Sequence, residues 1–270
     1  MTIAAVAALE SIHADLRRVL DEMSDDDWSK PSGCGGWRVQ DVFAHITSNL
    51  KEVADPTPPP AEPGPALPAE QAMEALVAPR KSWTKQDLLD EYDRCVGPWL
   101  ATMRALQDEP TASTLGPLAD LGTYPMHLIA NAYAFDHYCH VRIDLLAPRG
   151  PLAVRLDEPT DDVVAPGIEW MLAGLPQMQV EDLRVLIRPI ALELTGPGGG
   201  TWTLRPADPA GSANLISVAQ GADEGVAATV TSSAHDFVSW GTARSPWRAS
   251  CQVTGDEQYA ASVLDHINII

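Results

Sequence analysis

The side chains best suited to chemistry are a carboxylate and an imidazole four positions apart, Asp136 and His140, and an imidazole from a distant segment, His45. Residues four apart in a helix lie on the same face, so Asp136 and His140 can offer two ligands to one ion. His45, in another apolar segment, can supply a third ligand. Two imidazoles, one carboxylate and open coordination positions suit a catalytic zinc or another divalent ion that acts as a Lewis acid.

The same three residues also allow a purely structural interpretation. Asp136 and His140 can form a solvated pair that contributes about 0.2–0.5 kcal/mol to the helix, while His45 is a core histidine with a hydrogen-bond partner. However, His45 lies between Ala44 and Ile46 in the segment expected to face the core, where an imidazole needs a partner. This placement favours the ligand interpretation.

Four segments of the first half repeat apolar residues at the spacing of an amphipathic helix. They cover residues 3–22, 37–53, 84–106 and 123–146. Thr84 is expected to cap the third segment, in which Pro98 can introduce a kink or a break. The proline-rich stretch 56–68 cannot be helix interior, and we expect a surface loop there rather than an interdomain linker. These segments predict an up-and-down four-helix bundle, with the candidate ligands on its second and fourth helices.

The second half contains short runs of Val, Ile, Leu and Thr separated by turn residues. Strands are predicted at 184–194, 201–205, 215–218, 226–231 and 250–253, and helices at 161–173, 232–240 and 256–264. The glycine-rich run 196–200 follows a strand without opening a helix, so we expect a hairpin turn rather than a dinucleotide-binding loop. The order of elements indicates a smaller α+β domain over 150–270, after a helical domain over 1–149.

Charge and hydropathy argue against several kinds of partner. The 270-residue chain has 18 basic and 37 acidic side chains and a formal net charge of −19, which disfavours nucleic acids and anionic membranes. The sequence contains no apolar run that could cross a bilayer, and its N-terminal segment lacks the unbroken apolar core of a signal peptide. The four cysteines form no CxxC pair, so we expect reduced thiols in a cytoplasmic protein.

Three segments resemble the mycothiol-dependent maleylpyruvate isomerase family of the DinB-like superfamily. The first and most specific combines Trp28 with PSGCGGWRVQDVFAH at 31–45. The second, FDHYCH at 135–140 followed by Asp144, is similar to the E-x-x-x-H helix of that family. The third, at 233–256, contains SAHDFVSW, Arg244 and VTGD and resembles the sterol-carrier-like domain that many members carry.

The resemblance implies a metal-binding four-helix bundle followed by the smaller α+β domain. It implies that His45, Asp136 and His140 bind a divalent metal, usually zinc, which activates the thiol of mycothiol as a nucleophile. In the isomerase the thiolate adds to a conjugated double bond, rotation follows, and elimination returns the other geometric isomer. In relatives the thiolate attacks an electrophile and remains in a conjugate. Asp136 departs from the family, which more often has glutamate at this position.

The resemblance also points to Arg244, which is similar to an arginine that lies near the metal and contacts an anionic substrate or cofactor. An arginine fork suits a carboxylate, although the neighbouring Arg248 is a competing candidate. His137 is a spare ligand candidate, but it lies about 100° around the helix from Asp136, so we expect it to point elsewhere.

Together these features predict a metal-dependent mycothiol S-transferase or isomerase that acts on a small electrophile, which can bear a carboxylate. Two alternatives remain open. The bundle can instead be degenerate and support a non-catalytic domain that binds small molecules, or the same metal site can activate water and make the protein a hydrolase. The expected partners are a small-molecule substrate and a low-molecular-weight thiol, and the sequence has no clear signal for an oligomeric state.

Overall fold

The computed structural model describes residues 3–58, 67–178, 182–207 and 214–269. Its internal contacts divide the chain into two compact units, Met1–Glu158 and Pro159–Ile270. The division falls a few residues after position 149, where the sequence analysis ends the first domain. Each unit is described separately below. No helix in the described part of the chain combines the length and the apolar character needed to span a membrane.

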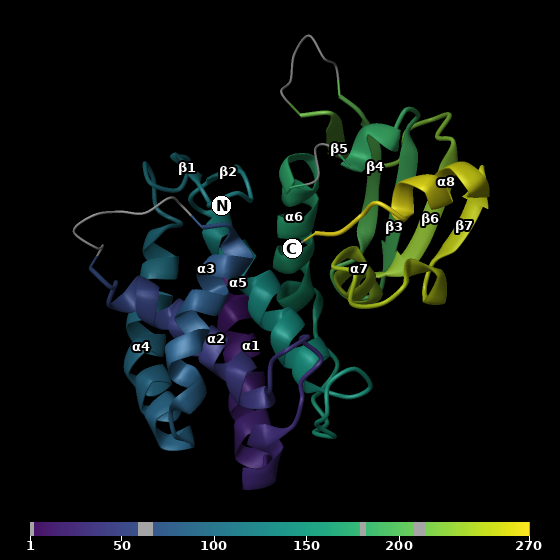
Figure 1. Ribbon diagram of the computed structural model, residues 1–270. Helices are drawn as coiled ribbons and strands as arrows, with labels where there is room; N and C mark the ends of the chain where they lie inside the picture. Colours follow the sequence, from purple (N-terminus) through teal and green to yellow (C-terminus); the bar gives the residue numbers. More distant parts are fainter. Residues whose placement is uncertain (1–2, 59–66, 179–181, 208–213, 270) are drawn as a thin grey trace. The chain divides into compact units, whose positions relative to one another are not determined.

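The first unit consists mainly of helices (Figure 1). They are α1 (Ile3–Glu22), α2 (Val39–Ala54), α3 (Ala69–Val77), α4 (Lys85–Ala105) and α5 (Leu128–Cys139). Helix α2 packs against α4, while α1 contacts both α4 and α5, so these four helices enclose a common core. Short 3-10 helices at Asp25–Ser29 and Ala78–Ser82 precede α2 and α4. The sequence did not predict α3, a nine-residue helix that directly follows the proline-rich stretch.

Helix α4 begins where its capping residues predict. The Thr84 hydroxyl accepts a hydrogen bond from the Asp87 backbone N–H at 3.2 Å, and the Asp87 carboxylate accepts one from the Thr84 backbone N–H at 2.9 Å. The helix continues through Pro98 to its end at Ala105. Pro98 lies on an exposed face, where water can solvate the carbonyl that loses its helical N–H donor.

The predicted helix over 123–146 starts too early, whereas its predicted end is confirmed, with the last turn a π-helix. Thr123–Pro125 forms strand β2, which pairs antiparallel with β1 (Leu115–Pro117). Proline at the end of β2 disfavours helix in the residue before it, and helix α5 begins only at Leu128. At the other end, the chain passes from α5 into a π-helix, His140–Leu145. The loop prediction at 56–68 stays largely untested, because residues 59–66 lie outside the described residues.

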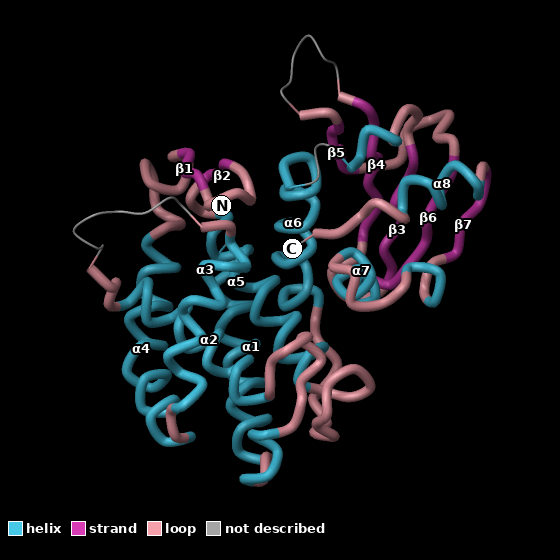
Figure 2. Tube along the Cα trace, in the orientation of Figure 1, coloured by secondary structure: helices cyan, strands magenta, loops and turns pink. Residues whose placement is uncertain are grey.

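The second unit contains a five-stranded mixed sheet in its described residues (Figure 2). Its strands are β3 (Ile190–Thr195), β4 (Gly200–Pro206), β5 (Ile216–Gln220), β6 (Ala228–Ser233) and β7 (Gln252–Gly255). The order is β5-β4-β3-β6-β7, with β3 and β6 parallel at the centre and the other pairs antiparallel. The glycine-rich run forms the predicted hairpin turn between β3 and β4, and its Gly196 and Gly198 have φ of 75° and 74°.

Three helices pack on this sheet: α6 (Asp161–Met178), α7 (Ala234–Gly241) and α8 (Glu257–Leu264). Ser233 caps α7 by accepting from the Asp236 N–H at 2.9 Å, which fits the helix predicted over 232–240. Strand β3 starts later than predicted, because Asp182–Val185 forms a 3-10 helix whose Leu183 is buried. A helical region followed by an α+β unit confirms the predicted fold class.

Candidate metal centre

The three predicted ligands come together in the first unit. His45 lies in the middle of α2, Asp136 lies on α5, and His140 lies where α5 passes into the π-helix. Nε2 of His45 is 3.1 Å from Oδ2 of Asp136, and Nε2 of His140 is 3.4 Å from Oδ1 of Asp136. One potential ligand atom from each residue lies within 4.8 Å of the others, so the three form a possible metal site.

Helix α2 holds His45 in the core. Arg38 precedes the helix, and the Asp41 carboxylate accepts from the Arg38 backbone N–H at 2.9 Å while also binding its guanidinium. This reciprocal contact fixes the first turn. One turn after His45, Asn49 directs its Nδ2 at Oδ2 of Asp136, 3.2 Å away. The sequence analysis did not single out Asn49, although it lies four residues from His45 on the same helical face.

Asp144 orients His140. Its Oδ2 lies 2.9 Å from Nδ1 of His140, and its Oδ1 accepts from Nε of Arg149 at 3.3 Å. This contact holds the His140 ring with Nδ1 toward Asp144 and Nε2 toward Asp136, so that Nε2 can bind a cation once it has lost its proton. Asp144 is fully buried. In the sequence Asp144 stands out only as part of the second motif, although its four-residue spacing from His140 could have indicated the contact.

The donor set fits a divalent cation. Two imidazole nitrogens and one carboxylate are common zinc ligands, and they face one another rather than solvent. The side chains of His45 and His140 are 4% and 7% exposed, whereas that of Asp136 is 29% exposed. The exposed side of Asp136 therefore leaves an approach for a further ligand such as a substrate.

Electrostatics at the site favour a carboxylate beside a cation. Burial opposes ionisation of Asp136, but the imidazoles of His45 and His140 outweigh it and hold its pKa well below the usual range. Burial also disfavours a charged His140, yet the carboxylates of Asp136 and Asp144 outweigh this and raise the pKa of His140 to about 9. In the metal-free protein His140 is therefore protonated at neutral pH, and a cation that binds there must displace that proton.

Trp37 covers the two imidazoles. Its ring centroid lies 5.2 Å from that of His45 and 6.2 Å from that of His140, and its indole N–H donates to Glu74 at 2.8 Å. The preceding loop is fastened to the π-helix, because the Gly33 N–H donates to the Asp144 carbonyl at 2.7 Å. A Cβ at Gly33 would lie 3.0 Å from the Cα of Asp144, so glycine permits this approach. The first sequence motif thus forms one wall of the site.

A second pair of histidines lies behind the site. Nδ1 of His137 is 3.0 Å from Nε2 of His13 on α1, while Nε2 of His137 is 3.7 Å from Oδ2 of Asp136, so this ring lies closer to Asp136 than the helical spacing predicts. His13 also contacts the Tyr92 hydroxyl, 2.7 Å from its Nδ1. Burial, with a smaller contribution from Arg17, lowers the pKa of His13 to about 4, and burial holds the pKa of His137 well below its usual range.

The lowered pKa of His13 predicts acid-sensitive stability. Between pH 6.5 and about 4 the unfolded chain binds a proton at this position that the folded protein does not, so the free energy of unfolding falls as the pH falls. The expected slope is about 1.4 kcal/mol per pH unit from this group. Urea unfolding across this range measures it, and the His13→Phe variant is expected to give a flatter curve. Parallel curves for the two proteins would contradict the prediction.

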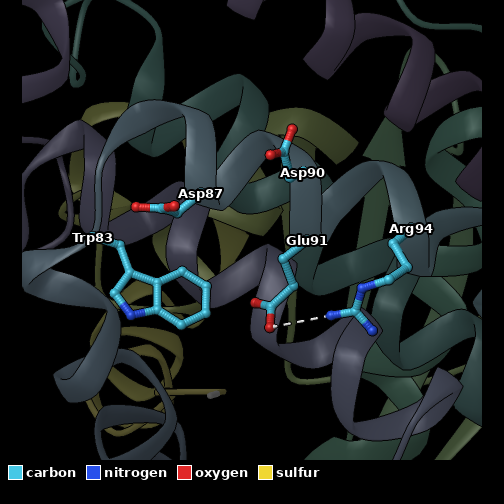
Figure 3. Close-up of a pocket in the computed structure, with 5 residues that line it drawn as sticks. All are labelled: Trp83, Asp87, Asp90, Glu91 and Arg94. Atoms are coloured by element: carbon cyan, nitrogen blue, oxygen red, sulfur yellow. Dashed lines mark ion pairs between the residues drawn. The ribbon is translucent and has the colours of Figure 1, made fainter.

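A surface cavity of about 540 Å³ lies elsewhere in the first unit (Figure 3). It is lined by Trp83, Asp87, Asp90, Glu91 and Arg94 and contains none of the predicted ligands. Two of its carboxylates have structural roles, since Asp87 caps α4 and Glu91 pairs with the buried Arg80 at 2.7 Å.

The two candidate arginines lie in the second unit after α7. The Arg244 backbone N–H donates to the Ser239 carbonyl at 2.9 Å. The Arg248 guanidinium forms two hydrogen bonds with Asp265, at 2.5 and 2.9 Å. The role of Arg244 toward an anionic ligand stays a prediction.

Comparison with known proteins connects this geometry to a family. The model of the mycothiol maleylpyruvate isomerase N-terminal domain matches residues 9–145, just over half of the chain. The chain belongs to the mycothiol maleylpyruvate isomerase N-terminal domain family. The matched segment contains all three candidate ligands. A comparison with curated proteins gave no match.

Solved structures support the fold of this family member over both units. A crystal structure of the mycothiol-dependent maleylpyruvate isomerase and one of a point mutant of that enzyme are similar, with TM-scores of 0.55. Their sequence identities to this chain are 15% and 16%, and the match covers 94% of this chain and 96% of each of theirs. At this identity the likeness shows a shared fold.

Proposed function

We propose that this protein is a metal-dependent enzyme that activates a low-molecular-weight thiol, mycothiol, for attack on a small electrophile. His45, Asp136 and His140 would hold the divalent metal, zinc being the first choice. The observation that carries the proposal is the convergence of the Nε2 atoms of His45 and His140 on one carboxylate, at 3.1 and 3.4 Å. Membership of a family named for mycothiol-dependent isomerisation supports the choice of thiol.

The chemistry requires a thiolate at neutral pH. A divalent cation at this site lowers the pKa of a thiol in contact with it. Two further residues orient and cover the candidate ligands. Asp144 holds Nε2 of His140 toward Asp136, and Trp37 covers one side of the imidazoles. The thiol would lose its proton to solvent, and its sulfur would form a bond to one carbon of a conjugated double bond while the π electrons move onto the conjugated carbonyl. In a transfer the resulting enolate takes up a proton and the S–C bond remains. In an isomerisation, rotation about the new single bond comes first, after which the double bond re-forms, the S–C bond breaks and the thiolate leaves with the electron pair.

The shorter carboxylate at position 136 is compatible with this function. Aspartate has one methylene fewer than the glutamate that is more common in the family, so its carboxylate must lie closer to α5. Both of its oxygens nevertheless reach the imidazole nitrogens, with Oδ1 and Oδ2 3.3 and 3.1 Å from Nε2 of His45. The shorter side chain of Asp136 therefore still reaches His45 from α5.

The test of the function combines metal content with thiol dependence. Protein purified without a histidine tag is expected to contain close to one equivalent of zinc or another divalent ion. It is also expected to turn over an electrophile such as a maleyl-type unsaturated acid only when mycothiol is present. Less than about a tenth of an equivalent, with no uptake on titration, would contradict the metal site. Turnover without any thiol would favour the hydrolase, and bound metal with no turnover would favour the binding protein.

Arg244 provides a separate prediction, on substrate binding. If its guanidinium binds a carboxylate of the substrate or of mycothiol, Arg244→Met is expected to raise the corresponding KM about tenfold to a hundredfold. Steady-state kinetics with a charged and an uncharged electrophile measure the effect. Arg248→Met is the matched control, because Arg248 already pairs with Asp265, and it should leave KM unchanged. Equal changes in KM for Arg244→Met and Arg248→Met would contradict the assignment of Arg244 to the anionic group.

A further inference from the structure

A chain of three buried polar side chains leads from the core of the first unit to Asp136. The Tyr92 hydroxyl oxygen is 2.7 Å from Nδ1 of His13, and Nε2 of His13 is 3.0 Å from Nδ1 of His137. Nε2 of His137 in turn lies 3.7 Å from Oδ2 of Asp136. Tyr92, His13 and His137 are 1%, 5% and 0% exposed and come from α4, α1 and α5.

The protons of this chain can be arranged in two directions. Burial favours the neutral form of both imidazoles, so each ring has one N–H and one lone pair to place. In the first arrangement Tyr92 donates to His13, His13 donates to His137, and the Nε2–H of His137 faces Asp136. In the second, the hydrogen bonds are reversed and a lone pair of His137 faces the carboxylate. A carboxylate attracts an N–H and repels a lone pair, so the charge of Asp136 selects the first arrangement.

The surroundings restrict both rings to this geometry. The indole of Trp99 is fully buried, and its centroid lies 5.0 Å from that of His13 and 5.4 Å from that of His137. The guanidinium of Arg17 lies 4.5 Å above the Tyr92 ring, and its positive charge disfavours a second proton on His13. Nε2 of His137 has no hydrogen-bond partner among the residues that the structure describes.

We infer that His13 and His137 are positioning residues for Asp136: with Tyr92 they fix one tautomer of His137 and direct its Nε2–H at the carboxylate. At 3.7 Å the contact is electrostatic rather than a hydrogen bond. The contact with His137 therefore restrains the position of the Asp136 carboxylate. It leaves the carboxylate lone pairs available to a cation held by His45 and His140. The inference rests on the proposed role of Asp136 as a metal ligand.

The tautomers can be measured directly in metal-free protein. Nitrogen-15 NMR of the imidazoles distinguishes a proton on Nε2 from one on Nδ1, and it does not depend on metal or turnover. Both His13 and His137 are expected to carry the proton on Nε2. A proton on Nδ1 of His137 in the parent protein would overturn the inference. If the parent protein binds no zinc, the proposed function fails. The NMR measurement still decides in which direction the hydrogen bonds run between Tyr92, His13 and His137.

Variants of His13 test whether the hydrogen bonds between Tyr92, His13 and His137 affect metal binding at Asp136. His13→Phe fills similar space but breaks the chain, and it is expected to raise the zinc Kd, measured by chelator competition, about tenfold to a hundredfold. His13→Gln can rebuild the chain, because its amide oxygen accepts from Tyr92 and its amide N–H donates to His137. We expect this variant to have a zinc Kd within about threefold of the parent.

A matched variant separates positioning from loss of packing. Leu9 is buried on α1 one turn before His13, and Leu9→Ala opens a cavity without touching the polar chain. Its zinc Kd is expected to stay near that of the parent even though the protein is less stable. The inference fails if His13→Phe and Leu9→Ala change the zinc Kd equally, or if His13→Gln is no better than His13→Phe.

Discussion

Replacing His45 with alanine is expected to leave less than about a tenth of an equivalent of bound metal and to lower thiol-dependent turnover at least a thousandfold. The variant keeps Asp136 and His140, which remain one helical turn apart, but removes the ligand from α2. Two ligands from a single helix leave the cation without a donor from across the bundle. Metal analysis of purified protein and turnover with and without mycothiol measure the two effects.

The control for this prediction is the replacement of an exposed histidine outside the candidate site. His266 is exposed, and its Nδ1 lies 2.8 Å from the Ser262 carbonyl. His266→Ala should keep both metal and turnover. Circular dichroism is expected to show that His45→Ala retains its helices, because alanine is the strongest helix former. A His45→Ala protein with a full equivalent of metal would show that the cation binds elsewhere.

The largest expected effect on stability comes from the buried ion pair between Arg80 and Glu91. Two hydrogen bonds of 2.7 and 3.0 Å join the side chains, which are 8% and 7% exposed, and Arg80 also donates to the Leu76 carbonyl at 2.7 Å. Glu91→Gln removes the negative charge and leaves the guanidinium uncompensated. Breaking a buried pair in this way destabilises a protein by about 3–5 kcal/mol. Urea unfolding of the metal-free protein measures the change.

An exposed pair with the same geometry is the comparison. Asp265 accepts two hydrogen bonds from Arg248, but its side chain is 45% exposed and that of Arg248 57%. Asp265→Asn is expected to change the free energy of unfolding by less than about 1 kcal/mol, because water solvates the arginine that remains. Similar losses of stability from the two variants would contradict the prediction that burial makes the Arg80–Glu91 pair the more costly one to break.

The sequence predicts which three residues come together at the candidate site, because their positions follow from local rules. A carboxylate and an imidazole four residues apart must share a helical face, and a histidine inside an apolar run must be buried. The same reasoning locates Thr84 as a cap and the glycine run as a hairpin turn, since capping and tight turns depend on the residues present at those positions.

Contacts between distant elements explain what the sequence analysis missed. Residues 123–125 pair with a strand that lacks a strong pattern of its own, so only tertiary pairing defines that hairpin. The π-helix depends on contacts that Asp144 makes with His140 and Arg149. His13 interrupts the apolar stripe of α1, which marks it as unusual, but its partner His137 lies 124 residues away. Pairing of that kind cannot be read from spacing.

The π-helix at His140–Leu145 has a consequence for the gene as well as for the protein. A π turn holds one residue more than an α turn, so deleting a single codon between His140 and Asp144 would let the regular helix continue. Asp144 would then stand three residues after His140 instead of four, while Asp136 would keep its four-residue spacing, so the contact of Asp144 with Nδ1 of His140 would have to form from a different position on the turn. The orientation of His140 thus depends on the number of residues in this turn. A deletion changes that number, whereas a point substitution does not.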